Sequence, residues 1–306
     1  MKFGFNLTAE YGLDSIVEKA AEVERLGFDS LWIFERPGWD YGSIVASALA
    51  ANTKEIRIGL GVSPLLHTSK QIADEILTLI KTYGERFDLC LIPGDKRHLR
   101  RLGVNPTARK AAPQRILQAK REIEKLLAGE ERSCSIWLGA QGPRMLRTAQ
   151  HYRGVHLNYA SPRMITWALE HIGSTGEKRE FEVSVMAPSY VYRNFEERLQ
   201  HLLKLAASSV AVSAPREVLE EFGLYDRLAE LRGYEGRLSE LDPASLPPEV
   251  VEFSLSMHST ELPSYLAVVQ GLGINHLIFS HPQDYSLKTI HELASSLPLN
   301  SKNDTH

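Results

Sequence analysis

Short apolar segments alternate with amphipathic helical segments along this chain, and that alternation restricts the fold more than any other feature. Eight apolar segments of strand length occur, at residues 2–7, 30–35, 56–62, 87–94, 135–140, 154–159, 181–192 and 274–282. Most are separated by segments with apolar residues at helical spacing, such as Ile16, Ala20 and Val23. Buried strands joined through helices favour a parallel sheet covered on both faces. Eight such units in 306 residues predict an α/β fold, a (β/α)8 TIM barrel.

One interval between the expected strands is much longer than the others. Residues 194–258 have a mostly helical pattern, which is interrupted by the proline-rich stretch "DPASLPPEV". We expect a helical insertion between strands 7 and 8 of the barrel, over about residues 213–258, beside the barrel mouth. Residues 1–299 then form a single TIM-barrel domain. Residues 300–306 contain no apolar side chain and are expected to be a frayed tail.

Composition excludes several classes of function. Hydrophobic residues make up 43% of the chain, which is enough for a large core. The net charge of −3 provides no field that would attract nucleic acid over the whole surface. Cys90 and Cys134 lie in apolar runs and are expected to be buried free thiols. No apolar run is long enough for a signal peptide or a membrane span, so we expect a cytoplasmic protein whose partner is a small-molecule substrate. The oligomeric state stays open, with a homo-oligomer among the alternatives.

The active site of such a barrel lies at the carboxyl ends of its strands. Glycines, amides and hydroxyls dominate these positions, and the acids among them are Glu35, after the second strand, and Asp95, after the fourth. A divalent metal would require several converging carboxylates and histidines, so no metal site is expected. The other candidate residues at the strand ends are Asn6, Gly61, Val62, Ser63, Gly94, Gly139, Ala140, Gln141, Gly142, Asn158 and Ser280.

The turn after the fifth strand, "GAQGP" (residues 139–143), carries few side chains. One interpretation is a tight connection between a strand and a helix. The other is an anion site, because free backbone N–H groups at a helix start bind phosphate and Gly142 has no Cβ to block the approach. Gln141 could add an amide donor, and Arg144 and Arg147 could add charge.

Several motifs, in order along the chain, resemble the luciferase-like superfamily of flavin- and deazaflavin-binding barrels. They are "AAEVERLGFDSLWIFE", "WDYGSIVASALAANTKEIRIGLGVSPL", "TLIKTYGERFDLCLIPGDKRHLRRLGV", "GAQGPRMLRTA", "LNYASP" and "GLGINHLIFSHP". The resemblance is strongest to the branch of methylenetetrahydromethanopterin reductase, which uses coenzyme F420. It covers most of the chain except about residues 213–258.

The resemblance implies a tricyclic cofactor ring at the barrel mouth, with the cofactor phosphate near Ala140, Gln141 and Gly142. It also implies a non-prolyl cis peptide bond at Gly61–Val62, pressed against one face of the ring. Cis bonds of this kind cost about 3–4 kcal/mol and are kept where function requires them. The full set of expected cofactor-binding residues is Gly61, Val62, Ser63, Gly94, Gly139, Ala140, Gln141, Gly142 and Asn158.

The chain departs from the family pattern at two acidic positions. The reductase has a glutamate after the first strand, where this chain has Asn6, and an Asp-His pair where this chain has Glu35-Arg36. The Gly-Asp pair after the fourth strand is kept as Gly94-Asp95. Asp95 and Glu35 are therefore the expected catalytic acid/base residues, with Asp95 favoured because it ends a buried strand. The basic run Lys96–Arg101 is either a solvated helix start or a landing site for the acidic tail of F420.

These observations predict an oxidoreductase that transfers a hydride between F420 and a small substrate, such as a C1-carrying tetrahydropterin. An FMN-dependent luciferase-like monooxygenase and a non-catalytic flavin-binding relative are the alternatives. A metal-dependent sugar isomerase or endonuclease barrel is a third, for which the expected metal ligands are missing.

Overall fold

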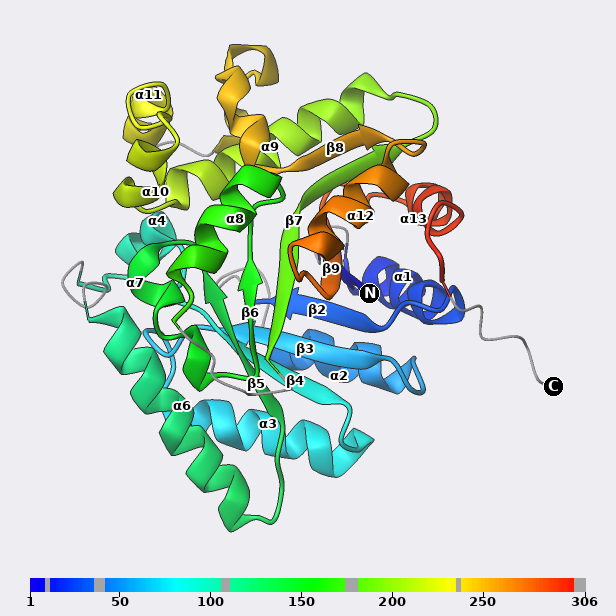
Figure 1. Ribbon diagram of the computed structural model, residues 1–306. Coiled ribbons are helices and arrows are strands. Elements are labelled where there is room, and N and C mark those ends of the chain that lie inside the picture. The colour runs from blue at the N-terminus through cyan, green and yellow to red at the C-terminus, as the bar shows by residue number, and fades with distance from the viewer. Residues whose placement is uncertain (9–11, 36–41, 106–110, 174–180, 235–237, 300–306) are drawn as a thin grey trace.

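The computed structural model describes residues 1–8, 12–35, 42–105, 111–173, 181–234 and 238–299. Eight parallel strands form a closed barrel in the order β1-β2-β3-β4-β5-β6-β7-β9, because β6 pairs with β7 and β9 pairs with β1 (Figure 1). Their bounds are β1 (Lys2–Asn6), β2 (Ser30–Phe34), β3 (Arg57–Val62), β4 (Phe87–Leu91), β5 (Ser135–Ala140), β6 (Gly154–Leu157), β7 (Glu182–Tyr192) and β9 (His276–Ser280). The predicted TIM barrel is confirmed.

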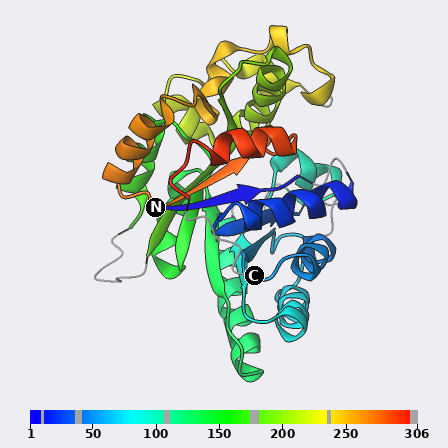
Figure 2. The same ribbon diagram turned by 90° about the vertical axis from the view of Figure 1, so that its right-hand side faces the viewer.

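Helices surround the barrel. They are α1 (Leu13–Arg25), α2 (Gly42–Ala51), α3 (Ser69–Tyr83), α4 (Lys96–Arg101), α6 (Ala112–Gly129), α7 (Pro143–Leu146), α8 (Pro162–His171), α12 (Leu262–Gly271) and α13 (Leu287–Ala294). Helix α3 shows how the sequence sets their limits: a capping box between Thr68 and Gln71 begins it, and Gly84, with a φ of 87°, ends it. The C-terminal helix α13 returns to pack against α1, beside the first strand (Figure 2).

The long interval between β7 and β9 contains α9 (Glu197–Ser213), α10 (Arg216–Glu221), α11 (Ala229–Gly233) and three short 3₁₀ turns, η3 (Leu238–Glu240), η4 (Pro243–Ser245) and η5 (Pro248–Phe253). It also contains a strand, β8 (Leu255–His258), which pairs with Ser189–Tyr192 of β7 outside the barrel. The expectation of an all-helical insertion was therefore wrong at its end. The residues of β8, LSMH, are only partly apolar and mostly not buried, so they lack the apolar pattern of the barrel strands.

Glycine and aromatic side chains share the barrel interior. A Cβ at Gly59 would lie 2.2 Å from the Trp32 ring, and one at Gly61 would lie 2.1 Å from the Phe34 ring. The glycines of β3 thus make room for the aromatic side chains of β2. Trp32, Cys90, Trp137 and Ile278 form the layer in the middle of the barrel.

Ion pairs occupy the interior at the amino ends of the strands. The Arg57 guanidinium donates two hydrogen bonds to the Asp88 carboxylate, from Nε to Oδ2 at 2.9 Å and from Nη2 to Oδ1 at 2.6 Å. Lys2 and Arg153 both bind the Glu182 carboxylate, at 3.0 and 2.6 Å. The side chains of Asp88 and Glu182 are 7% and 10% exposed, so each buried carboxylate has a cation directly on it.

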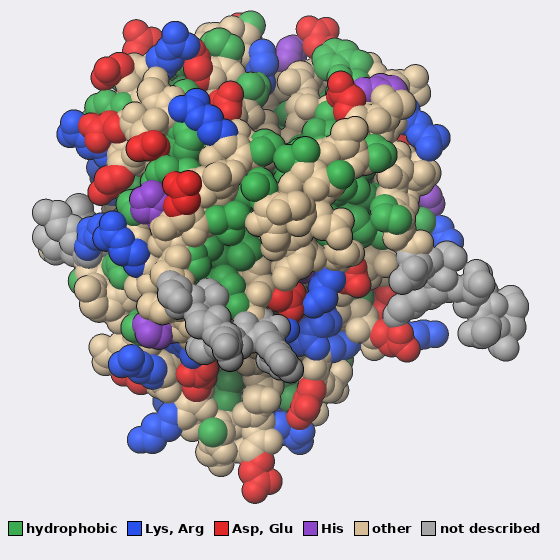
Figure 3. All heavy atoms as spheres, viewed as in Figure 1, with side chains coloured by type: hydrophobic (Ala, Val, Ile, Leu, Met, Phe, Trp, Pro, Cys, Tyr) green, Lys and Arg blue, Asp and Glu red, His purple; other side chains and the backbone are tan. Residues whose placement is uncertain are grey.

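The cysteines, the helices and the charged side chains can also be compared with the sequence. Cys90 is a buried free thiol, as predicted, whereas Cys134 is only half-buried. No helix in the described ranges is long and apolar enough to cross a membrane, and they contain no cluster of three or more possible metal ligands. On the face shown in Figure 3, acidic and basic side chains are interspersed rather than gathered into one field.

Candidate active site

A pocket of about 660 Å³ opens at the carboxyl ends of the barrel strands. Its floor and inner wall come from the strand ends: Phe34 at the end of β2, Ile92–Asp95 after β4, Gly139–Gly142 at and after the end of β5, His156 on β6, Asn158 directly after β6, and Met186 on β7. Its outer wall comes from α4, α6, α7 and α9 and from residues 215–217. A concave, mainly apolar site with a few convergent polar groups is the usual form of a cofactor or substrate pocket.

Most of the predicted site residues line this pocket together. They are Gly94, Asp95, Gly139, Ala140, Gln141, Gly142 and Asn158. Four cations also line it: Lys96, Arg100, Arg144 and Arg216. Arg147, which the sequence suggested as a further cation, is not among the lining residues. The acids in the lining are Asp95 and Glu217. The pocket therefore combines an apolar interior with an excess of positive charge.

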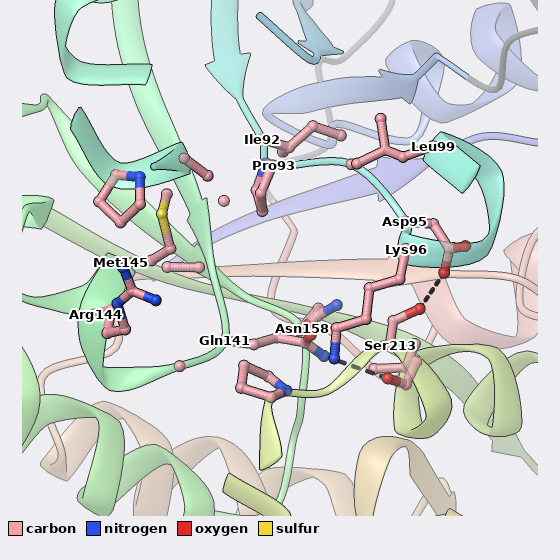
Figure 4. A pocket seen from close by; sticks show the side chains of 18 of the residues that line it. Ile92, Pro93, Asp95, Lys96, Leu99, Gln141, Arg144, Met145, Asn158 and Ser213 are labelled. Carbon is pink, nitrogen blue, oxygen red and sulfur yellow. Dashed lines mark hydrogen bonds between the residues drawn. The ribbon is translucent and has the colours of Figure 1, made fainter. Parts of the chain in front are cut away.

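A segment at the junction of α9 and α10, residues 213–215, crosses the pocket and binds two of its walls. Ser213 donates a hydrogen bond to Asp95 Oδ2, and Lys96 Nζ donates to the Ala214 carbonyl at 3.2 Å. Figure 4 shows both contacts on the same side of the pocket. Pro215 lies against Gly142 on the opposite wall. We call this segment the strap; it holds Asp95 at the pocket wall.

Gly142 is a glycine for a reason that the sequence did not reveal. Its φ of −112° is accessible to any residue, so backbone conformation does not require glycine. A Cβ there would lie 2.5 Å from Pro215 Cγ, closer than any real contact. Helix α7 after the turn has only four residues, so its dipole is small. The absence of a side chain at Gly142 therefore leaves room for Pro215 of the strap. An anion at this turn would be bound mainly by the nearby cations and by Gln141.

The third strand does not have the predicted cis bond. The Gly61–Val62 bond is trans, and the cis bond found among the described residues joins His281 to Pro282. Strand β3 stays in regular register with β4 through Val62, which pairs with Leu91, so no bulge forms there. Gly61, Val62 and Ser63 are buried and lie outside the pocket lining. The small size of Gly61 accommodates Phe34, and Phe34 in turn forms part of the pocket floor.

Glu35 also lies outside the pocket lining. Its Oε2 is 2.7 Å from His67 Nε2, and its side chain is only 9% exposed. This hydrogen bond raises the pKa of His67 above its usual value, against the opposing effect of burial. Arg36, the expected neighbour of Glu35, lies outside the described residues. Asp95 and Glu35 are thus in different environments, and Asp95 is the one that faces the pocket.

Two polar atoms, one on β6 and one directly after it, have no partner in the described part of the chain. They are Asn158 Oδ1 and His156 Nε2, and both residues line the pocket. His156 is 2% exposed, and burial holds the pKa of its imidazole well below the usual value. Buried polar atoms without a partner are rare and indicate a site that a ligand or water completes.

Sequence reasoning missed His156, Phe34, Met186 and the strap residues Ser213 and Pro215. A signal for His156 was present: it lies two residues before Asn158 in the same predicted strand, so both side chains point into the barrel. The strap residues gave no such signal, because Ser213 is 118 positions from Asp95.

The family comparisons agree with this geometry. Residues 1–133 match the family model described as luciferase-like monooxygenase. A 5,10-methylenetetrahydromethanopterin reductase from Archaeoglobus fulgidus is 26% identical over 73% of this chain and 74% of its own length.

Two solved structures share the fold over nearly the whole chain. The F420-dependent tetrahydromethanopterin reductase from Methanopyrus kandleri has a TM-score of 0.82 at 21% identity, covering 97% of this chain and 98% of that one. An F420-dependent secondary alcohol dehydrogenase has a TM-score of 0.75 at 14% identity, with the same coverage. The chain is thus similar to the luciferase-like family over its first 133 residues and shares the fold of these two structures, which confirms the resemblance that its motifs predicted.

Proposed function

We propose that this protein is an oxidoreductase that transfers a hydride between coenzyme F420 and a small substrate held in the pocket. The observation that carries the proposal is the pocket itself: an apolar site of about 660 Å³ at the barrel mouth, with four cations in its lining. A relative named as a methylenetetrahydromethanopterin reductase, and solved structures named as an F420-dependent reductase and an F420-dependent dehydrogenase, support this class of reaction.

The residues present fit a deazaflavin or flavin ring. The pyrimidine edge of such a ring carries an N–H between two carbonyls. Asn158 Oδ1 is a buried acceptor with no partner in the described residues, and it could receive that N–H. Ile92, Met145 and Met186 supply apolar surface for the ring faces. We assign the cofactor phosphate to the turn at Ala140, Gln141 and Gly142, beside Arg144.

The bound cofactor would supply the hydride chemistry, while the protein supplies position, water exclusion and a proton. Asp95 is the proposed acid/base, because its carboxylate lies in the pocket lining and Ser213 fixes its orientation. The methylene-tetrahydropterin class of substrate is the finer proposal, and it rests on the named reductases. An FMN-dependent monooxygenase is the second candidate, supported by the match of residues 1–133.

Separate titrations of the purified protein with F420, FMN and divalent metal ions test the proposal. We expect F420 to bind in the micromolar range or tighter, FMN to bind more weakly, and metal ions to leave the protein unchanged. Reduced F420 should then be consumed on addition of a methylene-tetrahydropterin. Tight FMN binding with oxygen consumption would instead establish the monooxygenase. No binding of either cofactor would refute both candidates.

The basic residues of the pocket distinguish F420 from FMN further, because only F420 carries a polyglutamate tail. Lys96 and Arg100 of the run 96–101 line the pocket. If they receive the tail, long-tailed F420 should bind more tightly than tail-less F420 at low salt, and the difference should shrink as salt screens the charges. Equal affinity of the two forms at low salt would make this run an ordinary solvated helix start.

A further inference from the structure

His156 occupies a particular position in the barrel interior. It pairs in register with Gly139 of β5 on one side and with Ser184 of β7 on the other. Its ring stacks on Trp137 at a centroid distance of 4.7 Å and an interplanar angle of 7°. The pocket reaches down to His156, which is one of its lining residues.

We assign the tautomer of His156 from the hydrogen bonds of Ser184. Ser184 has one hydroxyl proton, and its Oγ is placed to donate it to the Val155 carbonyl at 3.3 Å. Ser184 Oγ is also in hydrogen-bond contact with His156 Nδ1. With its proton directed to Val155, the oxygen accepts from Nδ1–H. A neutral imidazole protonated at Nδ1 has a bare lone pair at Nε2.

A second unpartnered acceptor lies near the Nε2 lone pair of His156. Nε2 of His156 and Oδ1 of Asn158 are both buried, and no described residue is a partner to either. His156 is on β6 and Asn158 follows directly after it, two residues further on, and both side chains line the pocket. The pocket floor therefore presents hydrogen-bond acceptors where a ligand with N–H donors would complete the pairing.

We propose that His156 selects the reduced form of the bound cofactor, because its Nε2 accepts a hydrogen bond that only the reduced ring can donate. This inference rests on the proposed function. Two-electron reduction of a deazaflavin or flavin adds a hydride at the ring centre and a proton at a ring nitrogen. A nitrogen that is a bare acceptor in the oxidised ring thus becomes an N–H donor. An acceptor in the pocket floor attracts the N–H of the reduced ring and repels the bare nitrogen of the oxidised ring.

Redox-dependent binding measurements on His156→Phe test the inference. The phenylalanine ring keeps the stack on Trp137 and removes both nitrogens. The dissociation constants of oxidised and reduced F420 are measured under anaerobic conditions, with FMN as a second probe. We expect wild type to prefer the reduced form, and His156→Phe to lose roughly threefold to tenfold of that preference, the usual effect of one buried hydrogen bond. A tenfold loss equals a shift of about 30 mV in the potential of the bound two-electron couple.

His276→Phe is the matched control. His276 is also a buried histidine of the barrel interior with an unpartnered ring nitrogen among the described residues, but it does not line the pocket. Its substitution should leave the preference unchanged. Ser184→Ala keeps the His156 ring and removes the group that fixes its tautomer, so it should lose part of the preference. Thermal unfolding checks that each variant is folded. If His156→Phe does not fold, Ser184→Ala provides the test instead.

The outcomes separate the inference from the proposed function. If wild type binds neither F420 nor FMN, the proposed function fails and this inference fails with it. If all variants bind with an unchanged preference, the proposed function stands and the role of His156 is refuted. If His156→Phe weakens the oxidised form more than the reduced form, Nε2 is a donor, and the inference is also refuted.

Discussion

The charged groups at the amino end of the barrel interior are paired, whereas two polar atoms at its carboxyl end are not. Among the described residues, His276 Nδ1, at the first residue of β9, is an exception at the amino end. At the amino ends of the strands, the buried carboxylates of Asp88 and Glu182 each hold at least one cation within 3.0 Å. At the carboxyl ends, His156 Nε2 and Asn158 Oδ1 are buried without a partner in the described ranges. Unpaired buried polar atoms cost stability, and where they line a pocket a ligand can complete their hydrogen bonds. The amino end therefore contributes mainly to stability, and the carboxyl end presents polar atoms that a ligand can bind.

The largest expected effect is at the carboxyl end, on reaction rate. Asp95→Asn removes the proposed acid/base and should lower turnover by about 10²–10⁴-fold, with cofactor affinity nearly unchanged. Glu35→Gln should lower it much less, because Glu35 binds His67 outside the pocket. Steady-state kinetics of both variants provide the measurement. A larger loss in Glu35→Gln would reverse the two roles, and no loss in either variant would favour a non-catalytic relative.

The next effect is on cofactor affinity. The new side chain in Gly142→Val would collide with Pro215 and displace the strap from the turn, so F420 binding should weaken more than tenfold, about 1.4 kcal/mol or more. Repeating the substitution in a Pro215→Ala background removes the Cγ atom that collides and should recover part of the affinity. Unchanged affinity in Gly142→Val would place the cofactor phosphate elsewhere.

At the amino end the expected effect is on stability alone. Asp88→Asn leaves the Arg57 guanidinium without its carboxylate and should lower the free energy of unfolding by about 1–2 kcal/mol. This is less than for a fully buried pair, because the Arg57 side chain is 46% exposed. Urea denaturation measures the loss, and kinetics should show turnover unchanged. A loss of turnover without a loss of stability would show that this end also takes part in function.

The smallest effect concerns the Glu35–His67 pair, which lies at the carboxyl end but is fully paired. Because the pKa of His67 is raised in the folded state, its stabilising contribution is present below the unfolded value of 6.5 and is lost as pH rises through the folded value. Tm values of wild type and His67→Gln, compared from about pH 5.5 to about pH 8.5, should differ most at the acidic end. A difference that grows with pH would contradict this pairing.

The fold could be predicted because its signals are local. Alternation of strands and helices shows in any window of the sequence, and the bounds of β5 and β2 agree with it to within one residue. The reason for Gly142 could not be predicted, because Pro215 meets it from a distant part of the chain. The cis bond was wrong because it came from a family pattern, whereas the local pairing of Val62 with Leu91 keeps β3 regular.

The candidate site was predicted in part for the same physical reason. Asp95, Gly139 and Asn158 could be found because each follows or ends a strand that the sequence shows, and the barrel geometry brings strand ends together. Ser213 belongs to α9, and no local pattern says that this helix closes over the pocket. Contacts between distant segments decide which groups are paired, and therefore which remain for a ligand.

Thermal unfolding with and without saturating F420, on one variant from each end, tests the central claim most directly. At 100 times its dissociation constant a ligand adds about 2.7 kcal/mol to the stability of the protein that binds it. Asp88→Asn should lower the Tm of the free protein and keep the full rise on adding F420. Asn158→Leu should leave the Tm of the free protein nearly unchanged and lose most of that rise. If Asn158→Leu keeps the rise, or Asp88→Asn loses it, the cofactor does not bind at the carboxyl end of this barrel.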